Sequence, residues 1–241
     1  MLNNRQNPYL VPGAIVLVGV LVAAAIFLTG GGLSGGKTGE VADTAKDAGS
    51  LSAFEVAEDI GLKTEDFKRC MDEKRYAADV EADSQDAKSA GGTGTPFSVV
   101  INSAGTKYPV FGAFPFDQVK QIIDAALADD QETLKSLEEQ FGASVGELVP
   151  VSANDHINGD IDAPIKLVLF SDMQCPFCKS FHATLKQVMN EYNGQVAIIY
   201  RHLPLDQIHS NARPLAEGSE CAAELGGNDA FWAYVDKVFS G

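Results

Sequence analysis

Two cysteines separated by two residues carry the clearest chemical signal in the chain. The segment Cys175-Pro176-Phe177-Cys178 directly follows a short apolar run and opens a stretch with helical periodicity. At the start of a helix, unpaired backbone N–H groups and the helix dipole favour an anion, so we expect a stabilised, nucleophilic thiolate at Cys175. Cys178 lies one helical turn further on, within reach of a disulfide. The spacing predicts a redox pair in which Cys175 attacks and Cys178 resolves the mixed disulfide.

A zinc half-site and a static disulfide are the alternative uses of this pair. Zinc would need two more ligands at matching spacing, and Cys70, Cys221 and the four histidines supply no second pair, so we expect no metal. Pro176 presets the φ angle of the first helical turn, where its missing N–H group costs nothing. The context at the start of a helix therefore favours exchange chemistry.

A second signal is Thr95-Pro96, which follows a Gly-rich stretch and precedes an apolar run. Proline within a sheet is confined to the first residue of a strand or to an edge. A cis bond here would turn the preceding backbone groups toward the redox pair, but the residues alone favour the commoner trans bond.

Length, charge and cysteine content limit the possible partners. The chain has 241 residues, 33 acidic and 18 basic, and a net charge of −15. With 45% hydrophobic residues it can form one large or two small globular domains. The acidity argues against nucleic acid as a partner and against docking on anionic lipid through surface charge.

The first 50 residues differ from the rest. No charged residue occurs from 6 to 36, and twenty apolar residues in a helix would cover about 30 Å, the thickness of a bilayer core. We expect a short tail at 1–8, a transmembrane helix at 9–29 and a flexible linker at 30–50. A cleaved signal peptide is the alternative, although no small-residue cleavage site follows. An acidic body with paired cysteines favours a single-pass protein of the cell membrane whose soluble domain is extracytoplasmic.

The remainder reads as a mixed α/β chain. We expect helices at 51–61, 64–89, 116–127, 130–141, 175–192, 211–225 and 229–239, and strands at 97–102, 106–111, 166–170 and 195–200. Thr64 should be the N-cap of its helix, and residues 102–105 should close a hairpin.

Several polar residues near the pair receive no catalytic role. His182 lies two helical turns beyond the first cysteine, about 10 Å along the axis, and we expect it to pack in the core. We expect His202 and His209 to be turn or surface residues, and His156 lies in an irregular segment. Asp172 either biases the site electrostatically or serves the entry to the helix.

Two parts of the chain resemble a known family. Residues 156–241 resemble the front part of a DsbA-like thiol–disulfide oxidoreductase, a thioredoxin fold with a helical insertion, through HINGDIDAPIKLVLFSDMQCPFCKSFHATL, YRHLPL and HSNARPLAEGSECAAELGGNDAFWAYVDKVF. Residues 51–123 resemble the back part, including GTPFSVVINSAGTKYPVFGAFPFDQVKQII. Together they cover about two thirds of the chain, and the Cys-Pro-Phe-Cys motif at 175–178 and the Gly-Thr-Pro motif at 94–96 are specific.

The resemblance implies roles for particular residues. It implies that Cys175 and Cys178 are the redox pair, working without a cofactor, and that Pro96 is a cis proline facing them. The residues implied to contact substrate are Thr95, Pro96, Pro176 and Phe177. A structural disulfide is implied between Cys70 and Cys221, with two buried free thiols as the alternative.

The order of the two parts departs from the family. The half that carries Pro96 comes first, at 51–127, and the half that carries the redox pair follows at 156–241, with 128–155 connecting them. A circular permutant cut inside the helical insertion explains this order, and a swapped dimer or a rearranged gene would also do so. In a permutant, Gly241 should lie near the start of the helix at Leu51.

Two substitutions relative to the family bear on mechanism. Many relatives place a buried acid where this chain has Leu169, which predicts slower or more pH-dependent proton transfer at Cys178. The strongest oxidants carry histidine where this chain has Phe177. We therefore expect a potential less oxidising than about −120 mV, toward roughly −180 to −230 mV.

These inferences predict a membrane-tethered extracytoplasmic thiol–disulfide oxidoreductase. Its partners would be cysteine-containing client proteins and a membrane redox protein of the DsbB or VKOR type that reoxidises the pair. A reductase or isomerase using the same cysteines is the first alternative. A redox-silent, membrane-anchored binding module is the second.

Overall fold

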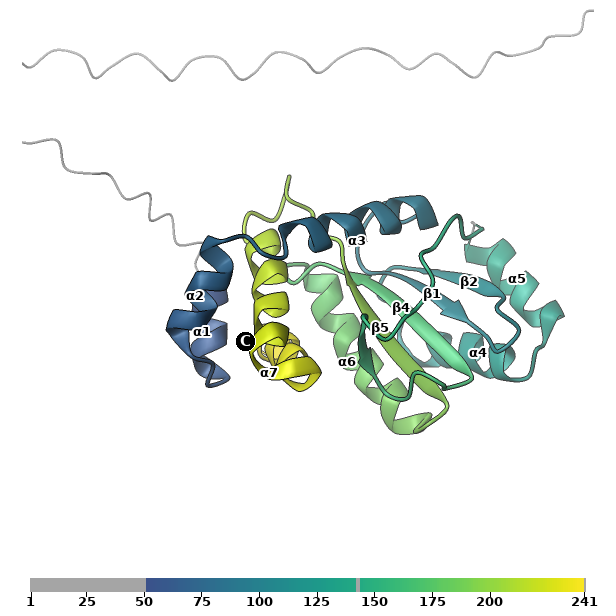
Figure 1. Ribbon diagram of the computed structural model, residues 1–241. Helices are drawn as coiled ribbons and strands as arrows, with labels where there is room; N and C mark the ends of the chain where they lie inside the picture. The colour runs from purple at the N-terminus through teal and green to yellow at the C-terminus, as the bar shows by residue number, and fades with distance from the viewer. Residues whose placement is uncertain (1–50, 142–143, 241) are drawn as a thin grey trace, which may run out of the picture. The chain divides into compact units, whose positions relative to one another are not determined.

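The structure, a computed structural model, describes residues 51–141 and 144–240 (Figure 1). These residues belong to one compact unit. The expected tail at 1–8, transmembrane helix at 9–29 and linker at 30–50 lie outside the described residues. Within the described ranges, every helix is too short or too polar to cross a bilayer.

A five-stranded mixed sheet forms the centre of this unit. The strands are β1 (Phe97–Ile101), β2 (Lys107–Phe111), β3 (His156–Asn158), β4 (Ile165–Ser171) and β5 (Val196–His202), in the order β2-β1-β4-β5-β3. Strands β4 and β5 are parallel, and the other neighbours are antiparallel. The prediction of a mixed α/β chain is confirmed. The short strand β3 was expected to be irregular, because three residues give no alternation to recognise and depend on pairing with β5.

The hairpin between β1 and β2 forms as the sequence predicts. The side-chain oxygen of Asn102 accepts hydrogen bonds from the backbone N–H groups of Ala104 and Thr106, at 3.1 and 2.9 Å. Gly105 adopts a φ of 81°, a left-handed conformation that glycine takes without steric cost. The turn therefore fixes the register of the two strands.

The described part of the chain contains seven helices. They are α1 (Ala53–Asp59), α2 (Thr64–Asp72), α3 (Ala77–Ala90), α4 (Phe116–Leu127), α5 (Gln131–Phe141), α6 (Pro176–Glu191) and α7 (Ala212–Ser240). Of these, α1 and α2 pack against α7 and not against the sheet (Figure 1). Helix α7 is interrupted at Gly227, where φ is 72°, so it consists of the two helical pieces that the sequence predicts.

The expectation of one helix at 64–89 is wrong. The chain breaks between α2 and α3, and Lys74 has a φ of 49°. Just after this break, Arg75 and Tyr76 both bind Glu224 of α7, so a contact distant in sequence accompanies the loss of helical bonds. Thr64 is also not an N-cap: the helix begins at Thr64 itself, and Lys63 is the cap.

The alternating residues of β4 and β5 face two separate cores. On one face, Leu167, Leu169, Ile198 and Tyr200 pack with α4, α6 and α7. The other face carries Val168, Phe170, Ala197 and Ile199, which pack against Ala87 and Ala90 of α3. Both cysteines of the predicted redox pair belong to the first core, so its composition decides their environment.

The first and last described helices pack against each other. Lys237 forms an ion pair with Asp59 at 2.7 Å, and the hydroxyl of Tyr234 donates to the carbonyl oxygen of Ala53 at 3.4 Å. The side-chain amide of Asn211 donates to the carbonyl of Leu51 at 2.9 Å. Gly241, expected near Leu51, lies outside the described residues.

Candidate functional site

Cys175 lies at the N-cap of α6, directly after the turn that leaves β4. Its backbone N–H donates to the carbonyl of Asp172 at 3.1 Å, and its own carbonyl accepts the N–H of Lys179 at 3.1 Å. Pro176 occupies the first helical position, as the sequence predicts. The sulfur therefore lies at the positive end of a sixteen-residue helix.

The two thiols of this pair differ strongly in acidity. A hydrogen bond from Cys178 and, against the effect of burial, interactions with Thr95 and the N–H groups of Cys178 and Phe177 lower the pKa of Cys175 to about 5. Burial raises the pKa of Cys178, and its hydrogen bond to Cys175 raises it further. Both cysteines are free of a disulfide here. Cys175 is thus suited to be a thiolate nucleophile or leaving group, while Cys178 stays protonated.

The Thr95–Pro96 segment meets the pair from the other half of the chain. The peptide bond is cis, and the carbonyl oxygen of Thr95 lies 3.5 Å from the sulfur of Cys175. Pro96 immediately precedes β1, and its carbonyl accepts the N–H of Gly112. The structure therefore brings together residues 80 positions apart in the sequence.

The surface beside Cys175 is apolar and open. The side chain of Phe177 is 65% exposed, and Pro176 is exposed, whereas Cys175 is only 4% exposed. A partner molecule must therefore approach the sulfur across these two side chains and the Thr95 backbone. Such a surface suits an extended peptide better than a charged small molecule.

A buried carboxylate supports the turn into α6. Asp172 accepts hydrogen bonds from the backbone N–H groups of Gln174 and Leu205, at 2.7 and 2.8 Å, and its second oxygen lies 2.8 Å from Nδ1 of His209. Its backbone N–H donates to the sulfur of Cys178 at 3.4 Å. Asp172 thus fixes the entry to the helix, and His209, expected as a turn or surface residue, is half-buried against it.

A second buried cluster was missed by sequence reasoning. His202 was expected in a turn or at the surface, but it ends β5, is 1% exposed, and its Nε2 lies 2.9 Å from Glu220. Nε2 of His156 lies 2.9 Å from the other oxygen of Glu220. Burial raises the pKa of Glu220, but the two imidazoles outweigh it and lower the pKa to about 2. Glu220 lies 64 residues from His156, so no local spacing could have indicated this cluster.

Two further residues lie where the sequence places them. His182 is buried in α6 with Nε2 2.6 Å from Asp236, so the expected packing role is confirmed. Leu169 is 2% exposed in the core that contains Cys178, so this position offers no proton. Within 51–141 and 144–240, no group of three His, Cys, Asp or Glu side chains is arranged to hold a metal ion.

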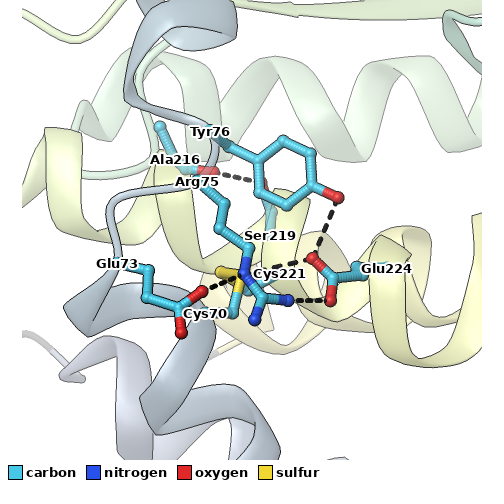
Figure 2. Close-up of a disulfide and its surroundings, with 8 residues drawn as sticks. All are labelled: Cys70, Glu73, Arg75, Tyr76, Ala216, Ser219, Cys221 and Glu224. Carbon is cyan, nitrogen blue, oxygen red and sulfur yellow. Dashed lines mark hydrogen bonds and ion pairs between the residues drawn. A yellow bond between two sulfur atoms is a disulfide. The ribbon is translucent and has the colours of Figure 1, made fainter.

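Cys70 and Cys221 form a disulfide that joins α2 to α7 (Figure 2). Their Cα atoms lie 5.9 Å apart across a sequence separation of 151 residues. Glu224 covers the bond: it binds Arg75, accepts the Tyr76 hydroxyl at 3.1 Å, and approaches the Cys70 sulfur to 3.7 Å. Cys70 lies in the second half of α2 and Cys221 in the interior of α7, so neither is at the start of its own helix.

Two family models match separate parts of the chain. A thioredoxin model matches residues 152–241, and a DSBA-like thioredoxin domain model matches residues 41–124. Neither covers half of the chain. With the mixed α/β sheet, these matches support a similarity to DsbA-like proteins of the thioredoxin superfamily.

Individual relatives match over smaller shares. The Na(+)/H(+) antiporter NhaA 3 of Salinispora tropica is 37% identical over 42% of this chain, and the Na(+)/H(+) antiporter NhaA 1 of Mycolicibacterium gilvum is 34% identical over 36%. This chain spans only 15% and 14% of those proteins. The crystal structure of Pseudomonas aeruginosa DsbA2 matches with 35% identity, covering 38% of this chain and 50% of that chain, with a TM-score of 0.35.

Proposed function

We propose that this chain is a membrane-tethered, extracytoplasmic thiol–disulfide oxidoreductase that exchanges disulfides with client proteins through Cys175 and Cys178. The observation that carries the proposal is the asymmetry of the pair. One sulfur has a pKa lowered to about 5, and the next lies buried with its pKa raised. The DSBA-like family match supports the same chemistry.

In the oxidising direction, two successive thiolate attacks move the disulfide from the pair to the client. A client thiolate attacks the Cys175 sulfur, the Cys175–Cys178 bond breaks, and Cys178 leaves and takes up a proton. A second client thiolate then attacks the client sulfur of the mixed disulfide, and Cys175 leaves as a thiolate. The client loses two electrons and becomes a disulfide, while the pair becomes a dithiol.

The lowered pKa of Cys175 favours this direction. A stable thiolate is a good leaving group, and its stability in the reduced pair makes the oxidised pair a stronger oxidant. We propose that the client chain lies across Thr95 and Pro96 and contacts the exposed ring of Phe177. A membrane partner of the DsbB or VKOR type would accept the two electrons and restore the disulfide.

We also propose that the order of the chain is a circular permutation. In support, β4 from the second half pairs with β1 from the first, and α7 packs against α1 within one chain. Residues 128–155 would then join the original termini. A monomeric mass in light scattering agrees with this proposal, whereas a dimer that dissociates only on unfolding indicates exchanged halves.

The tether and the location rest on the apolar segment 9–29 and on the acidic body. Protease added to intact cells and to lysed cells tests both. Digestion of the domain without lysis, with the fragment at 1–29 retained in the membrane, supports the proposal. The antiporter relatives are matched over too little of their length to suggest ion transport for this chain.

A trapping experiment tests the exchange function. Cys178→Ala should accumulate mixed disulfides between Cys175 and client proteins, seen as adducts on non-reducing gels that disappear with reductant. Cys175→Ala is the matched control and should give none. If the folded Cys178→Ala protein captures nothing, the chain is a redox-silent binding module. If trapping succeeds, insulin reduction measured against oxidation of a dithiol peptide decides between the reductase or isomerase and the oxidase.

A further inference from the structure

The exchange reaction requires a proton at a sulfur that solvent does not reach. Cys178 is 2% exposed, and it must gain a proton when the disulfide opens and lose it when the disulfide closes. Its contacts among the described residues are the backbone N–H of Asp172, the neighbouring thiol and the Ser171 hydroxyl, and Leu169 of the same core is apolar. The proton must therefore reach Cys178 through other side chains of the same core.

The register of the sheet identifies those side chains. Residues paired across neighbouring strands project to the same face of the sheet, and here Leu169 pairs with Tyr200 and Ser171 pairs with His202. Leu169, Tyr200 and Cys178 belong to one core cluster, so this face looks toward the buried thiol. Ser171 and Tyr200 are each 2% exposed. They are hydroxyl groups enclosed with Cys178 beneath α6.

The hydroxyl of Tyr200 is a buried polar group without a hydrogen-bond partner in the described part of the chain. Burial raises its pKa, whereas nearby Ser171 lowers it, and Ser171 also lowers the pKa of Cys178 against the effect of burial. Ser171 therefore lies close to both the Cys178 thiol and the Tyr200 hydroxyl. An unpaired buried hydroxyl is costly, and such a group calls for an explanation.

We propose that Ser171 and Tyr200 carry the proton to and from Cys178 during disulfide exchange. When the disulfide opens, Cys178 leaves as a thiolate and receives a proton from the Ser171 hydroxyl, which is replenished from Tyr200. When the disulfide closes, the proton moves in the opposite direction. The two hydroxyls end each cycle unchanged. This proposal rests on the exchange function proposed above.

A chain of polar contacts leads from His202, which packs against Tyr200, toward the surface. The ring of His202 lies edge-on to Tyr200, with centroids 5.3 Å apart, and its buried Nδ1 has no partner among the described residues. Its Nε2 contacts Glu220, which contacts His156, whose side chain is 17% exposed. Asp172, Asp83 and Cys178 are the other titratable groups near Tyr200, and each raises the pKa of its hydroxyl. We assign to His202, whose ring packs against Tyr200, the replacement of the Tyr200 proton.

Tyr200→Phe is the decisive variant because it removes only the hydroxyl. The oxidised full-length protein is mixed with reduced glutathione, and the reduced protein with oxidised glutathione, and both time courses are quenched with acid and read by mass spectrometry. If Tyr200 relays the proton, Tyr200→Phe should slow exchange with glutathione at least about tenfold in both directions, because general acid–base catalysis is lost. Because a relay lowers one barrier from both sides, the equilibrium constant should stay within about twofold.

The matched control is Tyr234→Phe. Tyr234 is also fully buried, but its hydroxyl donates to the carbonyl oxygen of Ala53 on α1. This variant should exchange at the wild-type rate. Tyr200→Phe should be at least as stable as the wild type to heat, because the hydroxyl it loses has no partner. Ser171→Ala should slow exchange in the same way, which makes the result independent of one substitution.

The outcomes separate this proposal from the exchange function itself. If wild type exchanges with glutathione and Tyr200→Phe matches it within about twofold, the relay is overturned while the function stands. If Tyr200→Phe shifts the equilibrium constant as much as the rate, its role is electrostatic and the relay is also overturned. If Cys178→Ala traps no client and wild type does not exchange, the proposed function has failed before the relay is tested.

Discussion

The two cysteine pairs of this molecule are equally buried but chemically opposite. The four side chains are between 0 and 4% exposed, so access to solvent does not distinguish them. Cys70 and Cys221 lie within helices, joined by a disulfide and covered by Glu224. Cys175 and Cys178 lie at the start of α6, where N–H groups and a neighbouring thiol stabilise a thiolate. The comparison indicates that position within the helix, and not exposure, separates a reactive pair from a structural one.

The two pairs also differ in how much they restrict the unfolded chain, and therefore in how much they contribute to the free energy of unfolding. The Cys70–Cys221 bond closes a loop of 151 residues, and the chain-entropy relation assigns such a loop about 5 kcal/mol. The Cys175 and Cys178 pair is separated by two residues, so opening and closing it barely changes the freedom of the unfolded chain.

The largest expected effect is the loss of disulfide exchange when the reactive cysteine is replaced. Cys175→Ser should abolish exchange with glutathione and with dithiol peptides, because it removes the sulfur that attacks and leaves. At a pH below about 5, where the thiolate contributes no stability, the unfolding midpoint of the reduced protein should change little, since the replacement is similar in size. Exchange that survives in Cys175→Ser would show that another cysteine carries the reaction.

The next largest effect is a loss of stability when the structural disulfide is removed. The double variant Cys70→Ala with Cys221→Ala should lower the free energy of unfolding by about 2–5 kcal/mol, measured with urea. Its rate of exchange with glutathione should match that of the wild type, since the redox pair lies outside the altered helices. A variant of unchanged stability would contradict the structural role of this bond.

The stability of the reduced protein should depend on pH through Cys175, whereas the disulfide-bonded Cys70 and Cys221 do not titrate. The pKa of Cys175 falls from an ordinary value near 9 to about 5, so its thiolate stabilises the reduced fold fully above about pH 9, and this contribution is lost as pH falls through about 5. Reduced wild type should therefore gain stability relative to reduced Cys175→Ala as pH rises across this window. Thiolate ultraviolet absorbance should titrate near pH 5, and a midpoint near 9 would remove the proposed asymmetry.

The smallest effect concerns the cover over the disulfide. Glu224→Gln removes the ion pair with Arg75 but keeps an oxygen that can accept the Tyr76 hydroxyl. Because this ion pair is partly exposed, we expect a small decrease in unfolding midpoint that vanishes at high salt. A decrease as large as that of the double cysteine variant would mean that Glu224 positions the sulfurs.

Sequence reasoning reached the parts of this molecule that local patterns encode. The apolar run of β4, the proline at the start of α6 and the Asn102 turn were all readable, because each depends on neighbours within a few residues. The break at Lys74 was not, because its flanking residues are held by Glu224 far along the chain.

The polar groups around the candidate site show the same limit. Asp172 and His209 are 37 residues apart, and His202 meets Glu220 on a different element. A lone acid or histidine in a sequence has no spacing that names its partner. Only the fold showed that His202 is a buried strand residue, and only the register placed Tyr200 beside Leu169.

The packing of α1 against α7 has a consequence for synthesis. The Tyr234 hydroxyl that contacts Ala53 is 181 residues away in sequence, so the first helix emerges from the ribosome long before its partner exists. We expect little native structure in the nascent chain until almost the whole domain has been made. If the domain is exported as a translocating polypeptide, it would cross the membrane unfolded, and Cys70 would wait as a free thiol until Cys221 arrives.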